Sequence, residues 1–453
     1  MSVSRHSRRN FLKTAGVVSA GLAVGSSLST ARGANVAGSD VIKVALIGSG
    51  GRGVGCLLDR FAVGDAVKVV ALADVAKGTA ERAAAALAKM EDKKAMIDLS
   101  PERVFGGFDS YKKAIEFADL VLIASPPAFH PDHYLYAVEK GKHVFMEKPF
   151  GIDAEGYRRC MKANKIAEEK GLTVCAGFQR RHEKKYLEWM SRIHGGEIGD
   201  IISTDVYWNA AGAKVRGVRE EGEPEMSFQV RDWYFFNWLS GDHNVEQHCH
   251  NIDIGNWIHG KGDPLAHPVS CVGMGGRQVR RTPKFPYNEC GNIFDHHYVE
   301  YRYADESIMH SQCRQIPGCW NSVTENVAGT KGRGGVIWLQ QTGGAKWEYP
   351  RNSGDKSGFV QEHIDQAEAM RKGGKLHGGW SAATSTMIGV MGWMATHSGK
   401  EIKWDDAVAR GKTLFPYDKE LSYDMAPPVV PGPDGTYEHA VPVPGEYDPF
   451  DNA

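Results

Sequence analysis

The sequence has no excess of charge of either sign and no paired cysteine motif. Lys and Arg number 54 against 55 Asp and Glu, which gives a formal net charge of -1. Proteins that bind nucleic acid usually carry a basic excess, so nucleic acid is not expected as a partner. The eight cysteines include no C-x-x-C pair, which argues against a zinc knuckle or a thioredoxin-like centre and leaves disulfide formation open. The length of 453 residues predicts two domains with tails.

The sequence also lacks a long hydrophobic run. Its most membrane-like stretch, Thr14–Leu28, is too short and too rich in glycine for a membrane span. The segment S-R-R-N-F-L-K precedes it, and paired arginines before a weak hydrophobic region are typical of a twin-arginine export signal. We therefore assign residues 1–38 to a signal segment and expect export in folded form to the periplasm. A basic tail without structure is the alternative.

The stretch Val41–Gly55 organises the first domain. An apolar run ends at Gly48, and Gly50 and Gly53 follow at the spacing G-x-G-x-x-G before an amphipathic segment. This order predicts a strand, a tight glycine turn and a helix whose N terminus accepts a pyrophosphate. A second apolar run ends at Asp74, whose carboxylate is placed to accept the ribose hydroxyls of adenosine, which favours NAD over NADP. A glycine-rich turn that binds nothing is the alternative.

Apolar runs and amphipathic segments alternate from residue 41 to residue 178. This alternation predicts an α/β Rossmann domain with a parallel sheet, in which ligands bind beyond the carboxyl ends of the strands. The predicted strand Ala118–Ser125 is followed by two prolines, and His143–Met146 is followed by Glu147-Lys148-Pro149. The residues expected to contact the cofactor are Gly48, Gly50, Gly51, Arg52, Gly53, Asp74, Ser125, Pro126, His130, Glu147 and Lys148.

The pattern changes after residue 178. Apolar runs with fewer helical segments between them predict an α+β domain over residues 179–380, with a large, open, mostly antiparallel or mixed sheet. The predicted strands are Ile201–Trp208, Val269–Met274, His297–Tyr303, Ser307–Gln312 and Val336–Trp338. Helices are expected at Val360–Lys372 and Gly379–His397, with residues 381–405 packing back on the nucleotide domain. Residues 406–453, which become rich in proline and glycine, predict an extended tail.

Two further motifs resemble those of one known family. Glu147-Lys148-Pro149 stands at a strand end, and His250-Asn251-Ile252-Asp253 lies within G-D-H-N-V-E-Q-H-C-H-N-I-D. Together with the glycine turn, these motifs resemble the Gfo/Idh/MocA family, and the twin-arginine start resembles that of its exported members. The resemblance extends from about residue 41 to residue 405. It implies an NAD-dependent oxidoreductase that transfers hydride between the nicotinamide and a secondary hydroxyl of a sugar or polyol.

The resemblance also implies roles for particular side chains. Lys148 is expected near C4 of the nicotinamide, where its ammonium steadies the substrate oxygen, and Glu147 near the nicotinamide ribose. His250 is expected to be the general base, because imidazole accepts a proton near neutral pH. Glu246 stands four residues earlier, on the same face if the stretch is helical, where many family members carry aspartate. The substrate is expected to contact Lys148, Arg181, Trp233, Glu246 and Asp253.

Other interpretations of the same residues stay open. The histidines His243, His248, His250 and His259 favour a zinc site as a competing interpretation, although hydride transfer needs no metal and none is expected. Some relatives cleave glycosides without net redox change, by transient oxidation and elimination. A protein that binds sugar without catalysis is a third interpretation. The resemblance also implies a homo-oligomer, a dimer or a tetramer, because an exposed sheet face usually pairs with a partner.

Overall fold

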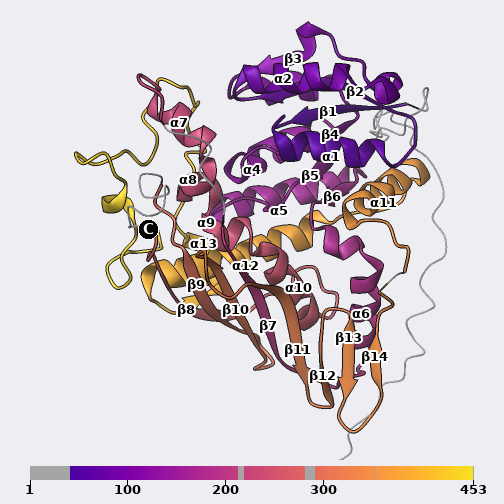
Figure 1. Cartoon of the computed structure of the whole chain (residues 1–453), viewed down its shortest axis with the longest axis vertical. Helices are drawn as coiled ribbons and strands as arrows, with labels where there is room; N and C mark the ends of the chain where they lie inside the picture. Colours follow the sequence, from indigo (N-terminus) through magenta and orange to yellow (C-terminus); the bar gives the residue numbers. More distant parts are fainter. Residues whose placement is uncertain (1–40, 213–218, 281–290, 352, 452–453) are drawn as a thin grey trace, which may run out of the picture. The chain divides into compact units, whose positions relative to one another are not determined.

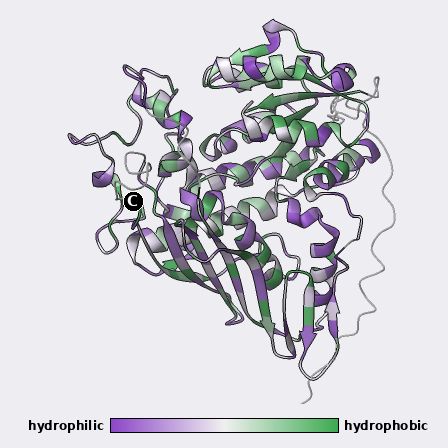
Figure 2. Ribbon diagram, in the orientation of Figure 1, coloured by the Kyte–Doolittle hydropathy of each residue, from purple (hydrophilic) through white to green (hydrophobic). Residues whose placement is uncertain are grey.

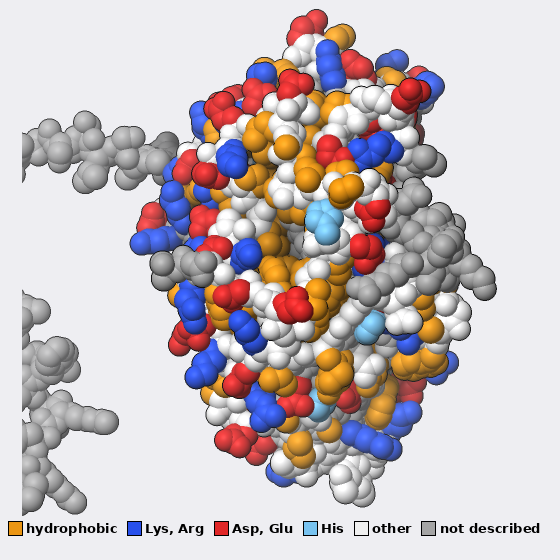
Figure 3. All heavy atoms as spheres, turned by 90° about the vertical axis from the view of Figure 1, so that its left-hand side faces the viewer, with side chains coloured by type: hydrophobic (Ala, Val, Ile, Leu, Met, Phe, Trp, Pro, Cys, Tyr) orange, Lys and Arg blue, Asp and Glu red, His pale blue; other side chains and the backbone are white. Residues whose placement is uncertain are grey.

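The structure is a computed structural model that describes residues 41–212, 219–280, 291–351 and 353–451. The predicted signal segment, residues 1–38, lies outside these ranges. The described residues belong to one compact unit that contains two sheets with helices packed against them (Figure 1). Figure 3 shows acidic and basic side chains interspersed over one face of the molecule, as the near-zero net charge predicts.

The first domain is built on a parallel six-stranded sheet. Its strands are β1 (Ile42–Ile47), β2 (Val67–Asp74), β3 (Val104–Gly106), β4 (Leu120–Ile123), β5 (His143–Met146) and β6 (Val174–Ala176), in the order β3-β2-β1-β4-β5-β6. β4 and β5 are buried along their whole length because helices cover both faces of the sheet. The strand order reverses between β1 and β4, the position at which such sheets bind dinucleotides. This architecture confirms the predicted Rossmann domain.

The helices of this domain connect the parallel strands. They are α1 (Gly51–Phe61), α2 (Lys77–Ala88), α3 (Ser110–Ile115), α4 (His130–Glu139) and α5 (Ala154–Glu169). α5 begins after Asp153, whose carboxylate accepts a hydrogen bond of 2.8 Å from the N–H of Gly156. A cap of this kind contributes about 1 kcal/mol to helix stability. Figure 2 shows mainly hydrophobic residues on the strands that these helices cover.

The second domain contains a nine-stranded sheet. Its strands are β7 (Ile201–Ala210), β8 (Ser270–Gly276), β9 (His296–Arg302), β10 (Ile308–Gln315), β11 (Ser322–Gly329), β12 (Gly332–Gly335), β13 (Trp338–Gln341), β14 (Lys346–Glu348) and β15 (Ile402–Lys403). Their order is β14-β13-β12-β11-β7-β10-β9-β8-β15. β7 and β10 are parallel, and the other neighbours are antiparallel. The sheet is therefore mixed and mostly antiparallel, which confirms the predicted fold class.

One of the five predicted strands of this sheet is wrong. Val336–Trp338 is mostly the turn between β12 and β13, where Ile337 has a φ of +70°. The sequence pattern also gives no indication of β11, β12 or β14. β12 reads Gly-Arg-Gly-Gly, which has low intrinsic preference for a strand. It forms because β11 and β13 pair with it on both sides.

Helices cover one face of the large sheet. α10 (Cys249–Gly260) and α12 (Gly379–Ser398) pack against it, and α12 also packs against α5 of the nucleotide domain. Every residue of α12 except Trp380 is buried, which explains why this helix is apolar on all sides. α11 (Gly358–Lys372), which falls within the predicted second domain, packs against α1 and β6. No helix of the described ranges is long and apolar enough to cross a membrane.

Shorter elements complete the described chain. They are α6 (Lys184–His194), α7 (Glu225–Arg231), α8 (Asn237–Ser240), α9 (Asp242–Glu246) and α13 (Trp404–Arg410). Beyond α13 the chain is irregular up to residue 451, apart from a short turn of 3-10 helix, Glu438–Ala440. This tail packs on the region around α8, where Phe415 stacks on Trp238 with ring centroids 6.1 Å apart. The seven cysteines in the described ranges are free thiols, and only Cys319 is exposed.

Replacement of two glycines of α12 by alanine should change the free energy of unfolding in opposite directions. At Gly392 an added Cβ would lie 2.0 Å from Oη of the buried Tyr301, whereas at Gly389 the nearest atom is Cα of Val245 at 3.5 Å. We expect Gly392→Ala to lower the free energy of unfolding by about 1–3 kcal/mol through overpacking. Gly389→Ala should raise it by up to about 1 kcal/mol through helix propensity. Urea unfolding of both variants measures these changes, and Tyr301→Phe should restore part of the loss. Equal effects of the two substitutions would contradict the packing.

Candidate functional site

The glycine turn lies between β1 and the N terminus of α1. Gly48 has a φ of +86°, and a Cβ there would lie 2.4 Å from the backbone nitrogen of Ser125, just beyond β4. A Cβ at Gly53 would lie 1.9 Å from the carbonyl oxygen of Gly48, so this glycine allows the helix to approach the turn. A Cβ at Gly50 or Gly51 meets no atom within 4 Å, so this side of the turn is open. The start of α1 has no side-chain cap among the described residues, and its N–H groups and dipole suit an anion.

A pocket of about 360 Å³ opens beside this turn. Its lining includes Gly48, Asp74, Ser125 and Pro126. The carboxylate of Asp74 accepts hydrogen bonds from the backbone N–H groups of Ser49 and Ala76, at 2.9 and 3.0 Å. A carboxylate held at this position attracts ribose hydroxyls and repels a 2′-phosphate. The residues present therefore fit the adenosine half of NAD.

His130 lies behind this pocket and does not line it. Its ring is 2.7 Å from the carbonyl oxygen of Ser125 and 2.7 Å from that of Pro149. These contacts connect the segment after β4 to the segment after β5. Burial lowers the pKa of His130 to about 4, although both carbonyls favour the charged ring. In the structure His130 positions two segments that face the cofactor site.

Lys148 stands at the end of β5 and reaches across to the second domain. Its Nζ donates to Oε1 of Glu246 at 2.7 Å and to the backbone oxygen of the same residue at 2.8 Å. The side chains of Lys148 and Glu246 are only 12% and 10% exposed. Burial disfavours the ammonium, but the attraction of Glu246 outweighs it and raises the pKa of Lys148. Lys148 is therefore charged at neutral pH.

The expectation that Glu246 and His250 share one continuous helix is wrong. α9 ends at Glu246, and α10 begins at Cys249. In an unbroken helix the carbonyl of Glu246 would accept the N–H of His250. Here that carbonyl accepts hydrogen bonds from Lys148 Nζ and from Cys249 Sγ, at 2.8 and 3.4 Å. The break between the helices still leaves Glu246 and His250 in the same pocket.

Glu147 is paired with Arg52 of the glycine turn. Its Oε1 accepts a hydrogen bond of 2.6 Å from Nε of Arg52, whose guanidinium stacks 4.8 Å from the ring centroid of Phe359. Glu362 lies 4.0 Å from the same guanidinium and is 0% exposed. Burial and repulsion by Glu147 raise the pKa of Glu362 well above its ordinary value. Glu147, which makes the shorter contact, is therefore the main partner of Arg52.

His250 lies on α10 between two aromatic rings. Phe178 meets it edge-on with ring centroids 5.7 Å apart, and Trp208 stacks on it at 6.0 Å. Burial and the nearby charges of Lys148 and Arg180 lower the pKa of His250 well below its ordinary value. The ring is therefore neutral at neutral pH and able to accept a proton. Its Nδ1 has no hydrogen-bond partner in the described part of the chain.

One pocket of about 680 Å³ lies between the two domains and collects most of the predicted site residues. Its lining consists of Arg52, Ala124, Ser125, Pro127, Glu147, Lys148, Gly177, Trp233, Glu246, His250 and Phe359. The three residues predicted to be catalytic are thus together, with Trp233 beside them. An ammonium, a carboxylate and a neutral imidazole in one pocket can bind a hydroxyl group and remove its proton.

Two residues predicted to contact the substrate lie elsewhere. Asp253 accepts hydrogen bonds of 2.8 Å from both Nε and Nη2 of Arg181, and one of 2.7 Å from Oγ of Ser385. The guanidinium of Arg181 also lies over the ring of Trp257, 4.7 Å from its centroid. Asp253 is 1% exposed, and neither member of the pair lines the pocket. The pair therefore joins the end of the nucleotide domain to α10 and α12.

The four histidines considered for a zinc site do not gather around one point. His250 lines the pocket, and His243 lies against Asp242. The rings of His248 and His259 contact the hydroxyl groups of buried serine and threonine side chains at 2.7–3.0 Å. The zinc site built from these four histidines is therefore not formed.

Comparison with known proteins identifies the first domain. A family model described as an oxidoreductase family with an NAD-binding Rossmann fold matches residues 42–178. Residues 42–178 thus match the Gfo/Idh/MocA oxidoreductase family. A second model, for signal sequences of the twin-arginine translocation pathway, matches residues 5–25 and confirms the predicted export signal. The open glycine turn and Asp74 agree with the NAD-binding description.

Several curated relatives are similar to parts of this chain. The scyllo-inositol 2-dehydrogenase (NAD(+)) of Bacillus subtilis is 29% identical over 31% of the chain and 35% of its own length. A glycosyl hydrolase family 109 protein of a Shewanella species is 29% identical over 43% of the chain and 44% of its own length. The chain thus spans about a third to a half of these relatives. The aldose-aldose oxidoreductase of Caulobacter crescentus is 15% identical, with a TM-score of 0.61 over 80% of this chain and 99% of that one, which shows a shared fold.

Some features of the pocket could not be predicted from the sequence. Phe359 is the second residue of α11, in the second half of the chain, and no motif connects it to the glycine turn. Arg52 and Glu147 are each predicted to contact the cofactor. Their hydrogen bond to each other could not be predicted, because 95 residues separate them in the sequence. A Cβ at Gly177 would lie 2.7 Å from Oε2 of Glu147, so this glycine makes room for the carboxylate.

Gly50→Ala and Gly53→Ala should separate cofactor binding from folding. A methyl group at Gly50 would occupy the open side of the turn, so we expect NAD affinity to fall at least about tenfold, or ~1.4 kcal/mol, with an unchanged melting temperature. At Gly53 the methyl group would meet the Gly48 carbonyl at 1.9 Å, so the melting temperature should fall. Isothermal titration with NAD and thermal unfolding measure the two effects. Unchanged NAD binding in Gly50→Ala would contradict the assignment.

Proposed function

We propose that this protein is an exported, NAD-dependent oxidoreductase that transfers hydride between a secondary hydroxyl of a sugar or polyol and the nicotinamide ring. The observation that carries the proposal is the convergence of Lys148, Glu246 and His250 on one pocket beside the glycine turn. The inositol dehydrogenase among the relatives and the aldose-aldose oxidoreductase among the solved structures support this substrate class.

The side chains of the pocket bind the oxygen and move the proton. NAD bound at the glycine turn supplies the acceptor for hydride and returns hydride in the reverse direction. Two N–H groups of Lys148 are held by Glu246, which leaves the third to donate to the substrate oxygen. The neutral ring of His250 accepts the hydroxyl proton as the carbinol carbon is oxidised. In the reverse direction His250 returns this proton to the new hydroxyl.

Export places a requirement on the cofactor. A periplasmic enzyme has no pool of free NAD to draw on, so we propose that NAD stays bound while one sugar is oxidised and another is reduced. The twin-arginine route carries folded proteins, which allows the cofactor to be loaded before export. Mass spectrometry of the cofactor released from the purified protein identifies it. Weak NAD affinity and loss of NAD during gel filtration would argue against this part of the proposal.

A second candidate function is redox-neutral glycoside cleavage by transient oxidation and elimination. The relative in glycosyl hydrolase family 109 supports it. The same pocket suits the first step, because oxidation of a ring hydroxyl again needs an ammonium at the oxygen and a base for the proton. Release of the aglycone from a nitrophenyl glycoside, without net formation of NADH, distinguishes this reaction from dehydrogenation.

We also propose that the chain forms a homo-oligomer through the face of the large sheet that helices leave open. Exposed apolar side chains on and beside this sheet include Val272 and Met274 of β8, 39% and 70% exposed, and Trp320, 65% exposed. Exposed apolar surface of this kind favours contact with a second copy.

Replacement of Lys148 or His250 tests the catalytic assignment. We expect Lys148→Met and His250→Ala each to lower kcat/KM on the best substrate of a sugar and polyol panel by about 10²- to 10⁴-fold. His310→Ala, a histidine of the sheet outside the pocket, is the control and should retain activity. NAD content and melting temperature are measured on every variant to separate catalysis from folding. Unchanged activity in Lys148→Met would overturn the proposal.

The pH dependence of the reaction should reflect the Lys148–Glu246 pair. His250 has a lowered pKa and Lys148 a raised one, so kcat/KM should be flat across the neutral range. Glu246→Gln removes the attraction that opposes burial, so the pKa of Lys148 should fall and activity should be lost at lower pH on the alkaline side. Glu300→Gln, on the sheet away from the pocket, should keep the wild-type profile. An alkaline limb that does not move in Glu246→Gln would contradict the role of the pair.

A further inference from the structure

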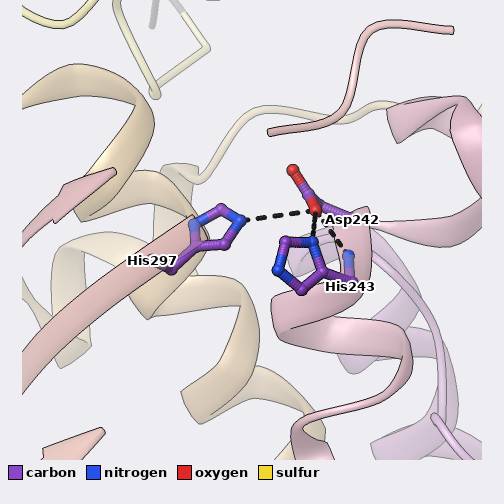
Figure 4. A group of neighbouring side chains, drawn as sticks. All are labelled: Asp242, His243 and His297. Atoms are coloured by element: carbon purple, nitrogen blue, oxygen red, sulfur yellow. Dashed lines mark hydrogen bonds and ion pairs between the residues drawn. The ribbon is translucent and has the colours of Figure 1, made fainter. Parts of the chain in front are cut away.

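A second group of titratable side chains lies at the start of α9, outside the catalytic pocket. Asp242 has a φ of +69°, and its side chain is 0% exposed. Around it stand His243 of the same helix, His297 of β9 and His397 of α12, none more than 1% exposed. Figure 4 shows the rings of His243 and His297 directed at one carboxylate oxygen of Asp242. The proposed function uses none of these groups.

The distances within this group are of two kinds. Nδ1 of His243 lies 2.7 Å from Oδ1 of Asp242, an ordinary length for a charge-assisted hydrogen bond. Nε2 of His297 lies 3.3 Å from the same oxygen, and Nε2 of His397 lies 3.5 Å from Oδ2. These two Nε2 atoms and Nε2 of His243 are buried and have no hydrogen-bond partner in the described ranges. Three buried ring nitrogens therefore have no partner in these ranges, and two of them, in His297 and His397, face the carboxylate.

The position of one ring hydrogen follows from the other contact of His397. Its Nδ1 lies 2.9 Å from the carbonyl oxygen of Trp393, which can only accept, so this nitrogen carries a hydrogen. In the neutral ring the lone pair of Nε2 then faces the carboxylate of Asp242. The hydroxyl of Thr396 lies 3.1 Å from the same carbonyl and 3.0 Å from Nδ1 of His297. A lone pair that faces a buried carboxylate is repulsive unless a cation stands between the two atoms.

The 2.7 Å contact of His243 has the length of a hydrogen bond, whereas the 3.3 Å contact of His297 fits two ligands of one metal ion. A proton held between a ring nitrogen and a carboxylate draws the two atoms to about 2.7–2.9 Å. Two ligands of a tetrahedral zinc ion, each about 2.0–2.1 Å from the metal, stand about 3.3 Å apart. The 3.3 Å between Nε2 of His297 and Oδ1 of Asp242 matches the second case. One ligand atom from each of Asp242, His243 and His297 lies within 4.8 Å of the others.

The surroundings of these rings are also those of metal ligands. A ligating imidazole usually donates its other N–H to a carbonyl or hydroxyl oxygen, which fixes the ring and leaves the second nitrogen for the metal. His397 does so to the carbonyl of Trp393, and Nδ1 of His297 lies 3.0 Å from the hydroxyl of Thr396. Both oxygens come from α12, so one helix orients two rings.

We propose that Asp242, His243 and His297 bind a divalent cation of the zinc class, with the ring of His397 beside the site. Binding replaces the Nδ1 hydrogen of His243 by a bond to the metal and releases one proton to solvent. The site is structural, because its side chains are closed to solvent, whereas a catalytic metal keeps an open position. It ties α9 to β9 and α12, and α9 ends at Glu246, the partner of Lys148.

Metal analysis of the intact protein tests this proposal without any measurement of activity. The mature chain is purified without a histidine tag from zinc-supplied medium, and its metal content is measured by inductively coupled plasma mass spectrometry. We expect about one zinc ion per chain, a lower melting temperature after treatment with dipicolinate, and recovery when zinc is added back. Less than about 0.1 metal ion per chain, with no rise in melting temperature on zinc addition, would overturn the proposal.

Variants locate the bound metal. Asp242→Asn and His297→Gln should each lose the zinc, whereas His259→Gln, a buried histidine that contacts Thr204 and Ser307, should keep it. Zinc retained by both ligand variants would place the metal elsewhere and overturn the assignment. If these variants do not fold, cobalt replaces zinc in the wild-type protein. The absorption bands of tetrahedral cobalt with nitrogen and oxygen ligands are then expected, and an octahedral spectrum would count against the site.

Discussion

The buried ammonium of Lys148 requires a partner, and this requirement organises the site. The lysine comes from the end of a strand in the nucleotide domain, and Glu246 comes from a helix of the second domain. Removal of one partner from a buried ion pair costs on the order of 3–5 kcal/mol, because the other charge is left without compensation. The pair therefore fixes how the two halves of the pocket face each other. It also ends α9, because the carbonyl that would continue the helix binds Lys148.

The glycine turn could be predicted from the sequence because its reasons are local. Gly48 and Gly53 each exclude a side chain through contacts with backbone atoms of the turn or of the neighbouring strand. Gly50 has space around it, and this difference within one motif separates the glycines that shape the turn from the one that leaves room for a ligand. Asp74 could be placed for the same reason, since the end of β2 lies beside the end of β1 in any sheet of this order.

The remaining contacts of the site depend on residues that are far apart in the sequence. Asp253 lies in the motif that resembles the family's catalytic segment, yet its carboxylate faces Arg181 and Ser385. On a helix of three to four residues per turn, Asp253 and His250 share a side only approximately, and packing decides which neighbour each one meets. Phe359 and the pairing of Arg52 with Glu147 are likewise consequences of the tertiary fold. β12 shows the same limit in the sheet, because its neighbours and not its glycines make it a strand.

Lys148 and Asp242 are both buried charged groups, so each needs hydrogen-bond partners or an opposite charge. Different kinds of groups surround the two. Lys148 has three hydrogens to donate, and Glu246 accepts two of them, so that pair is complete and still has a donor for a substrate. Asp242 has four lone pairs to satisfy and receives hydrogen bonds from the backbone N–H and the ring of His243 and from the N–H of Phe294. The rings of His297 and His397 lie farther away, at 3.3 and 3.5 Å. An uncompensated carboxylate at the start of α9 would weaken the segment that ends at Glu246. The proposed cation would supply positive charge at the histidine group and so support the segment that carries Glu246.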